Sequence, residues 1–462
     1  MTPATLPPAP AAPPAATVGP PAAVSFTEAL RFWLKLGFVS FGGPAGQIAI
    51  MHTELVERRR WISENRFLHA LNYCMLLPGP EAQQLATYIG WLMHRTWGGI
   101  VAGALFVLPS LFILIALSWI YLRFGELPVV AGIFYGIKPA VTALVLHAAH
   151  RIGMRALKNG WMWGIAAAAF VAIFAFDTPF PAIVAAAALI GHFGARRWPN
   201  VFALGGGHGS AKAGYGPALI DDTTPTPPHA RWTRRRLINV LVFGLGLWVI
   251  AFVALVAVFG VQGTLTQMGW FFTKAALLTF GGAYAVLPYV YQGAVEQHHW
   301  LTGAQMIDGL ALGETTPGPL IMVVAFVGFV GAWSHPVFGP DALFLAGALA
   351  ATIVTFFTFL PSFVFILAGG PLVEATHGKL GFTAPLSAIT AAVVGVILNL
   401  ALFFAYHVLW PQGFSARFDA LSALITVAAA LALFRFKVGV IPLLTVCAAV
   451  GLLVTLLAPS LR

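Results

Sequence analysis

The sequence is poor in charged residues. Asp, Glu, Lys and Arg make up 9% of its 462 residues, whereas hydrophobic residues make up 59%. A soluble domain carries about 25% charged residues. This composition excludes an ordinary soluble protein. Apolar runs of about 20 residues recur along the chain and are long enough to span a bilayer core. The sequence therefore predicts an all-α integral membrane protein.

Cysteine is equally scarce. Cys74 and Cys447 both lie in apolar surroundings, so we predict neither a disulfide framework nor a Cys-based metal site. The sequence also lacks a Walker A phosphate-binding loop, a His-Glu-x-x-His zinc motif and a Gly-x-Ser-x-Gly nucleophile motif. These absences argue against an ATP-driven motor and against an enzyme, and we predict no metal and no cofactor.

Basic residues outnumber acidic ones, which gives a formal net charge of +10. The excess could indicate a nucleic-acid partner, but the basic residues lie between apolar runs. Loops held on the cytoplasmic side of a membrane explain that distribution better. We predict the lipid bilayer as partner and no nucleic acid. The sequence leaves open whether the chain forms a homodimer.

Two stretches carry the same landmarks, 239 residues apart and without a gap. The landmarks are Lys35, Phe41-Gly42-Gly43, Trp61 and Pro78-Gly79-Pro80 in the first stretch, and Lys274, Phe280-Gly281-Gly282, Trp300 and Pro317-Gly318-Pro319 in the second. The chain is thus a duplicated unit whose core is a pair of Gly- and Pro-interrupted hydrophobic segments. In a membrane protein, this pattern points to a transport site.

The hydrophobic segments divide the chain into five parts. We predict a disordered Pro/Ala-rich tail over 1–25, a first repeat over 26–200, a cytoplasmic Gly/Pro/Arg loop over 201–236, a linking transmembrane helix over 237–263 and a second repeat over 264–462. Each repeat holds six hydrophobic segments, so the linking helix brings the total to about 13. Six crossings return the chain to the side on which it started, and the linking helix then takes it to the other side. The second repeat is therefore inverted relative to the first.

The basic loops orient this arrangement. By the positive-inside rule the N-terminus is cytoplasmic and the C-terminus external. Arg58, Arg59 and Arg60 fit that orientation if the broken segments are re-entrant, and do not fit if those segments cross fully. We favour partly re-entrant segments.

The breaks are the predicted binding site. A helix that stops inside a membrane leaves backbone N–H groups without partners, and these groups and the helix dipole favour an anion. Glycines let the backbone approach a ligand closely, and Pro80 and Pro319 suit the first turn of a new helix. The alternative is that the Gly pairs serve close helix packing alone.

Ionisable residues beside the breaks are the other candidates. Lys35 and Lys274 could supply positive charge, or could extend to the membrane interface. Glu81 and Glu314 could carry the proton of a coupled transport step, since burial disfavours the charged form; a structural hydrogen bond is the alternative. The predicted substrate-binding set is Lys35, Phe41, Gly42, Gly43, Pro78, Gly79, Pro80, Gln83, Gln84, Lys274, Phe280, Gly281, Gly282, Thr315, Thr316, Pro317, Gly318 and Pro319.

The motifs resemble those of the chromate transporter family in its long, two-unit form. They are Phe41-Gly42-Gly43-Pro44, Arg58-Arg59-Arg60-Trp61, Pro78-Gly79-Pro80-Glu81-Ala82-Gln83-Gln84, Leu108-Pro109-Ser110, Phe280-Gly281-Gly282 and Glu314-Thr315-Thr316-Pro317-Gly318-Pro319. The resemblance implies two antiparallel units and export of chromate across a bacterial inner membrane, driven by the membrane potential or a proton gradient.

Three alternatives stay open at this point. Chromate and sulfate share shape and charge, so a transporter for sulfate or another oxyanion, including an uptake system, is the nearest. A membrane-embedded chromate reductase would need a redox centre that two isolated cysteines cannot supply. A membrane scaffold without transport activity would leave the duplicated helix breaks unexplained.

Overall fold

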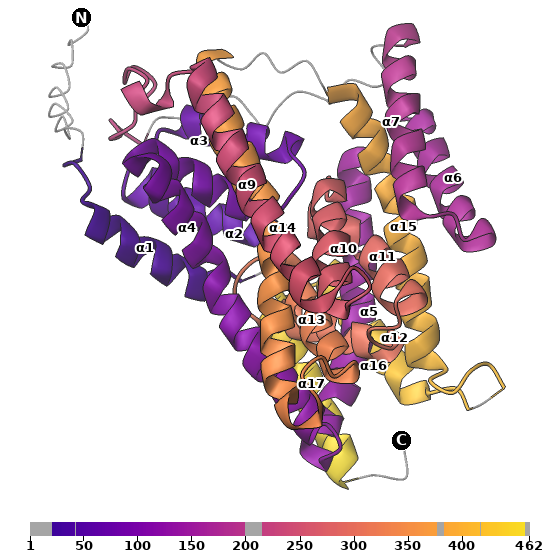
Figure 1. The fold of residues 1–462 in the computed structure, drawn as a ribbon. Coiled ribbons are helices and arrows are strands. Elements are labelled where there is room, and N and C mark those ends of the chain that lie inside the picture. Colours follow the sequence, from indigo (N-terminus) through magenta and orange to yellow (C-terminus); the bar gives the residue numbers. More distant parts are fainter. Residues whose placement is uncertain (1–20, 42, 199–214, 377–382, 416, 458–462) are drawn as a thin grey trace, which may run out of the picture.

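The computed structural model describes residues 21–41, 43–198, 215–376, 383–415 and 417–457. Within these ranges the regular elements are all helices, and one isolated bridge joins Ile62 to Ile220 (Figure 1). The all-α prediction is confirmed. Most of the predicted N-terminal tail and the first part of the predicted loop over 201–236 lie outside the described residues.

The described part of the first unit contains seven α-helices and one short π-helix. They are α1 (Phe26–Val39), α2 (Gly43–His52), η1 (Thr53–Arg58), α3 (Glu64–Leu76), α4 (Glu81–Phe124), α5 (Pro128–Ala156), α6 (Gly160–Phe176) and α7 (Phe180–Arg197).

The remaining described elements follow the loop. They are η2 (Pro228–Ala230), α9 (Arg234–Phe259), α10 (Thr264–Leu278), α11 (Ala283–Tyr291), η3 (Gln292–Gln297), α12 (Gly303–Thr315), η4 (Leu320–Met322), α13 (Val323–Ser334), η5 (Pro340–Ala342), α14 (Leu343–Thr376), α15 (Thr383–Leu409), α16 (Ala420–Phe434) and α17 (Val440–Leu457).

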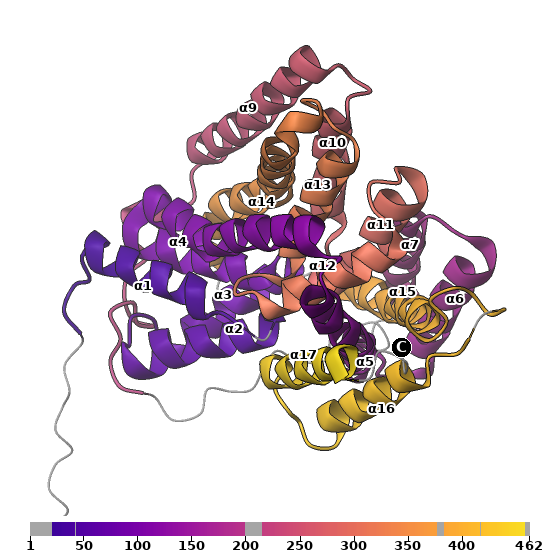
Figure 2. The same ribbon diagram turned by 90° about the horizontal axis from the view of Figure 1, so that it is seen from below.

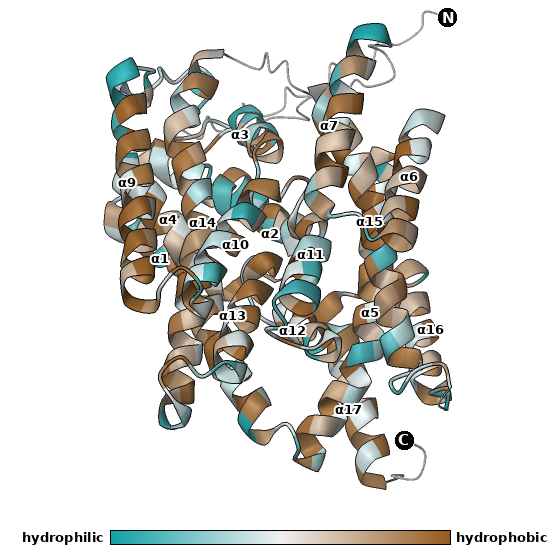
Figure 3. Ribbon diagram, turned by 45° about the vertical axis from the view of Figure 1, so that its right-hand side comes forward, coloured by the Kyte–Doolittle hydropathy of each residue, from teal (hydrophilic) through white to brown (hydrophobic). Residues whose placement is uncertain are grey.

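Six described helices are long and apolar enough to cross a membrane, namely α4, α5, α9, α14, α15 and α17. The most apolar stretch of α9 is only 11% buried inside the protein, and Figure 3 shows hydrophobic residues along most of this helix. Such a surface is stable against lipid and not against water. The chain is a multi-pass membrane protein, as predicted, while the count of about 13 segments stays a prediction.

The helix α4 is two helices folded back on each other. His94 and Arg95 have non-helical backbone angles, and Arg95 has φ +58°. Residues 81–93 form a first arm and residues 96–124 a second arm. A Cβ atom on Gly98 would collide with the carbonyl oxygen of Gly90, so the two arms approach to backbone contact. Small residues permit this packing in membranes.

The later helices of each unit pack on the other unit. Helix α5 packs against α16 and α17, whereas α15 packs against α6 and α7 (Figure 2). Both arms of α4 contact α14. The two units therefore share one helical body.

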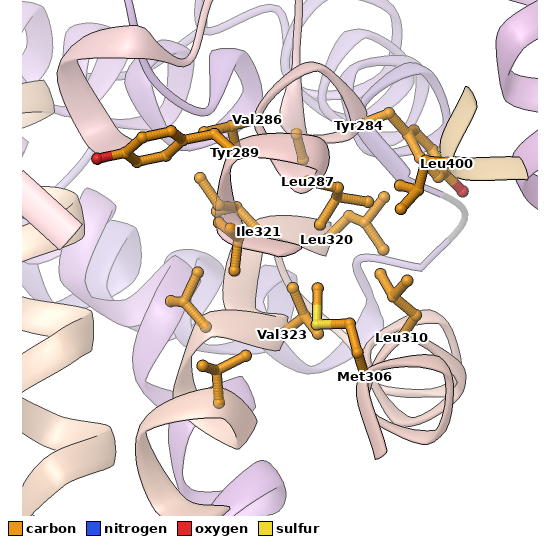
Figure 4. Packing of buried hydrophobic residues seen from close by; sticks show 14 of the residues in the cluster. Tyr284, Val286, Leu287, Tyr289, Met306, Leu310, Leu320, Ile321, Val323 and Leu400 are labelled. Carbon is orange, nitrogen blue, oxygen red and sulfur yellow. The ribbon is translucent and has the colours of Figure 1, made fainter. Parts of the chain in front are cut away.

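The broken segments of the two units differ in burial. All of Ala283–Val290 in α11 is buried, and these side chains share a core with α12, η4 and α15 (Figure 4). In the equivalent helix α2, only Gln47 and Met51 are buried. The first unit thus leaves its break more open than the second.

Candidate functional site

The four helix breaks meet in two pairs, and each pair joins one unit to the other. The amide of Gly79, in the first Pro-Gly-Pro, donates a hydrogen bond to the carbonyl oxygen of Thr279 over 2.7 Å. The amide of Gly318, in the second Pro-Gly-Pro, donates to the carbonyl oxygen of Ser40 over 2.8 Å. Ser40 and Thr279 hold equivalent positions in the two units, as do Gly79 and Gly318. We name these contacts the Gly79 crossing and the Gly318 crossing.

Local chemistry shapes the two helix ends that accept these bonds. Ser40 and Thr279 are the residues after α1 and α10, with nearly equal backbone angles of φ −82°, ψ 80° and φ −79°, ψ 77°. Each hydroxyl donates back to the carbonyl oxygen four residues earlier, Leu36 or Ala275. This bond satisfies the hydroxyl inside the apolar interior. The tight turn at the same residue directs its carbonyl at the other unit.

Glycine is required on the donor side of each crossing. Gly79 has φ +127° and Gly318 has φ +101°, a region that L side chains rarely adopt. Space is also lacking. A Cβ atom on Gly79 would lie 2.6 Å from Nε2 of Gln84, and one on Gly318 would lie 2.8 Å from Cβ of Ser110.

The Leu-Pro-Ser motif of residues 108–110 recurs at residues 360–362, and the serines of both copies face the crossings. Ser362 of α14 packs against Gly79, and Ser110 of α4 packs against Gly318. Each serine belongs to the unit opposite its glycine. The Ser110 hydroxyl is buried and has no hydrogen-bond partner among the described residues.

Most of the predicted glycines and prolines lie at the crossings. Gly79, Pro80, Thr316, Pro317, Gly318, Pro319 and Gly282 are buried, and Pro78, Phe41, Gly43, Phe280, Gly281 and Thr315 are half-buried. Gly43, Gly281 and Gly282 have positive φ, as expected where a helix ends and another starts. Gly42 lies outside the described residues.

The predicted side-chain donors are already engaged within the protein. Gln83 Nε2 donates to the hydroxyl of Thr87, and Gln84 Nε2 donates to the carbonyl oxygen of Pro78. The hydroxyls of Thr315 and Thr316 bond carbonyl groups of their own helix. Among the four, Gln84 supports a crossing directly, because Pro78 precedes Gly79.

The sequence analysis missed Gln47. This buried side chain of α2 donates through Nε2 to the carbonyl oxygen of Gly318, over 2.5 Å, and to that of Ser40, over 3.3 Å. Gln47 therefore binds both residues of the Gly318 crossing from α2. The clue in the sequence is a lone amide in an apolar segment, at a position where the second unit has Val286.

The structure does not bring Lys35 and Lys274 to the crossings. Both side chains are exposed, and Nζ of Lys274 lies 5.8 Å from the ring centre of Trp270. Ala29, Phe32, Trp33 and Leu36 form the buried face of α1, and Lys35 lies outside it. This placement favours the alternative in which both lysines reach toward a membrane interface.

Two arginines of α5 replace the lysines beside the predicted acids. Arg151 and Arg155 act electrostatically on Glu81, the first residue of α4. Arg151 acts on Glu314 as well. Glu314 is buried and accepts a hydrogen bond from the hydroxyl of Tyr284. Arg151 therefore acts electrostatically on both candidate acids, and the sequence analysis did not single it out.

Sequence comparison identifies relatives of the whole arrangement. A model of the chromate transporter family matches residues 27–192 and 266–452, once in each unit. A chromate transport protein of Pseudomonas aeruginosa is 32% identical over 81% of this chain and 80% of its own length. One of Cupriavidus metallidurans is 29% identical over 82% of each chain. A probable chromate transport protein of Synechococcus elongatus is 28% identical over 81% of this chain and 83% of its own.

No solved structure matches this chain. The matched regions contain every break, both Pro-Gly-Pro triplets and the Leu-Pro-Ser motifs that meet at the crossings. The chain belongs to the chromate transporter family.

Proposed function

We propose that this protein is a secondary active transporter that exports chromate across the bacterial inner membrane and so confers chromate resistance. The family and the named relatives support chromate transport. The observation that carries the proposal is the reciprocal pair of crossings, because helix breaks joined in an apolar interior create a polar site where a membrane protein otherwise has none.

The proposed anion site lies at the start of α4, beside the Gly79 crossing. Pro80 caps this helix without a side-chain hydrogen bond, so the first-turn amides of α4 are not occupied by a capping side chain. Helix N-terminal amides bind tetrahedral anions through hydrogen bonds and the helix dipole. Arg151 and Arg155 supply the positive charge that a dianion needs.

Glu81 and Glu314 are the proposed coupling groups. Both carboxylates share the field of Arg151, so they compete with the anion for the same positive charge. Protonation of either acid releases that charge to the substrate. A transport cycle in which proton and anion binding depend on each other follows from this competition.

We further propose that the two units are inverted and move against each other. The crossings come in pairs related by the sequence repeat, which is the pattern expected of two equivalent units joined about a two-fold axis. Rocking of one unit against the other then exposes the site alternately to the two sides. The N-terminus is proposed to be cytoplasmic and the C-terminus external, and the repeat boundaries and a homodimer stay predictions.

Uptake of labelled chromate into inside-out membrane vesicles tests the function. Energised vesicles that contain the protein should accumulate chromate above empty vesicles, and an uncoupler should abolish the difference. Inhibition by unlabelled sulfate would show a shared oxyanion site. Transport of sulfate without chromate would overturn the substrate assignment, and movement of neither ion by correctly folded protein would overturn the transport function.

A further inference from the structure

Two buried acidic residues join the units at places apart from the crossings. The first is Asp308 of α12, which is 2% exposed. Its Oδ2 atom lies 3.2 Å from Nζ of Lys138 on α5 and accepts a hydrogen bond from the hydroxyl of Tyr121 on α4 over 2.7 Å. Two helices of the first unit thus hold one acid of the second. We call these three residues the Asp308 latch.

The second acid is Glu374, near the end of α14, which is 8% exposed. Its Oε2 atom lies 3.2 Å from Nη1 of Arg66 on α3, and its Oε1 atom accepts from the hydroxyl of Tyr88 on the first arm of α4 over 2.5 Å. The same arginine donates to the carbonyl oxygen of Thr224 in the loop before α9. We call Glu374, Arg66 and Tyr88 the Glu374 latch.

The two latches occupy equivalent interfaces of the duplicated units. Helix α12 corresponds to α3, and the second arm of α4 corresponds to α14. The position of Asp308 in the second unit is that of His69 in the first, and the position of Tyr121 is that of Val373. His69 Nε2 indeed lies 3.2 Å from the carbonyl oxygen of Val373. Equivalent positions thus meet in both interfaces, through different groups, and the residues of the Glu374 latch lie beside this shared contact.

The latches lie toward opposite ends of the molecule. Figure 1 shows α3 near the end where α14 finishes and α9 begins, and α12 toward the end where α4 finishes. Helix α3 leads into the Gly79 crossing and α12 leads into the Gly318 crossing. The Glu374 latch therefore joins the units near one end of the molecule, and the Asp308 latch joins them toward the other.

Ionic contacts suit an interface that opens. A buried ion pair adds little net stability over an apolar contact, because desolvation offsets the attraction. When such an interface separates, water hydrates both charges and returns much of that cost, whereas an apolar contact loses its burial. The Oδ1 atom of Asp308 already lacks a hydrogen-bond partner among the described residues, so water entering this latch gains a ready acceptor.

We propose that the two latches are opposite gates of the transport cycle, with Arg66, Lys138, Asp308 and Glu374 as positioning residues. Separation of the Asp308 latch opens the central site toward the side of α12. Separation of the Glu374 latch opens it toward the side of α3. This inference rests on the proposed transport function, but its test does not require that chromate be the substrate.

Thiol labelling in vesicles of known orientation tests the gates. The reporter is Ser362→Cys, beside Gly79, in a chain with Cys74→Ala and Cys447→Ala. A membrane-impermeant thiol reagent is added from each side in turn. Asp308→Asn should raise the labelling rate from the α12 side about tenfold and lower it from the α3 side, as expected for a bias of about 1.4 kcal/mol between the two states. Glu374→Gln should do the reverse.

Milder variants and a control separate gating from damage. Tyr121→Phe and Tyr88→Phe each remove one hydrogen bond and should change labelling in the same directions, by smaller factors. Asp341→Asn removes an exposed acid of η5, away from both latches, and should change nothing. Labelling that rises from the same side in both acid variants, or from neither side, would overturn the proposal. If labelling shifts between the sides as expected but chromate uptake is not observed, the gate proposal stands and chromate is not the substrate.

Discussion

At the scale of single residues, the site depends on glycines, because they have no side chain. The bonds that join the units run from backbone to backbone, from Gly79 to Thr279 and from Gly318 to Ser40. The glycines contribute their positive φ and their lack of Cβ, and the neighbouring prolines fix where the next helix starts. Polar side chains such as Gln47 then fasten the crossing that the backbone has made.

Alanine at either crossing glycine should damage both folding and transport. Gly79→Ala and Gly318→Ala each place Cβ in an unfavourable φ region and against a packed neighbour. We expect a loss of about 1–3 kcal/mol in unfolding free energy, seen as a lower melting temperature in detergent, together with loss of chromate uptake. Gly164→Ala is the control, because its Cβ would meet nothing within 4 Å. Equal melting temperatures for all three variants would contradict this account.

Arginine rather than lysine should govern anion affinity. Arg151→Gln removes the charge beside Glu81 and Glu314, and we expect the KM for chromate to rise about tenfold, which corresponds to losing about 1.4 kcal/mol of binding. The matched controls are Lys35→Gln and Lys274→Gln, whose side chains are exposed and which should leave KM unchanged. If KM rises in the lysine variants and not in Arg151→Gln, the lysines and not Arg151 bind the anion.

At the scale of elements, the hairpin of α4 places the site. Its first arm begins at the Gly79 crossing, and its second arm carries Ser110 to the Gly318 crossing. One continuous element therefore touches both crossings. The reversal at His94 and Arg95 depends on Gly90, Gly98 and Gly99, where the arms come into backbone contact. Helix α14 meets both arms and carries the equivalent serine, Ser362.

Widening this hairpin should impair transport from a distance. Gly98→Val would force its side chain against the backbone of Gly90, and overpacking of this kind costs about 1–3 kcal/mol. Chromate uptake should fall along with the melting temperature. Gly246→Val in α9 is the comparison, since a Cβ there meets nothing within 4 Å. Normal uptake by the Gly98 variant would show that the crossings tolerate movement of the arms.

At the scale of the whole molecule, the duplicated units do not form separate bodies. Helix α5 of the first unit packs on α16 and α17, and α15 of the second packs on α6 and α7. Gly136 of α5 approaches the backbone of Cys447 and Gly451 in α17, as closely as small residues allow. Each unit therefore buries part of its surface only in the presence of the other.

Separated units should fold only together. A chain of residues 1–200 and one of residues 201–462, each expressed alone, should be degraded or aggregate in detergent, because α5 and α15 then lack their partners. Expression of both in one cell should restore a complex of normal size in size-exclusion chromatography and part of the chromate uptake. A stable, monodisperse first unit on its own would show that the exchanged packing is not required.

The sequence alone determined the features that are local. Hydropathy showed a membrane protein, the spacing of identical triplets showed the duplication, and Gly and Pro marked the breaks within a few residues. Burial on α1 was also readable, because Ala29, Phe32, Trp33 and Leu36 follow a helical period that excludes Lys35. The sequence analysis did not use this pattern when it placed Lys35 among the candidates.

Tertiary structure alone decided which breaks meet. Identical motifs in the two units give no local reason for Gly79 to pair with Thr279 rather than with Ser40, and that choice comes from how the units pack. The same holds for Arg151, Lys138 and Asp308, since the contacts of a charged side chain depend on the neighbours that other helices bring to it. Local preferences can be read from neighbouring residues in the sequence, whereas contacts between distant helices depend on how the whole protein packs.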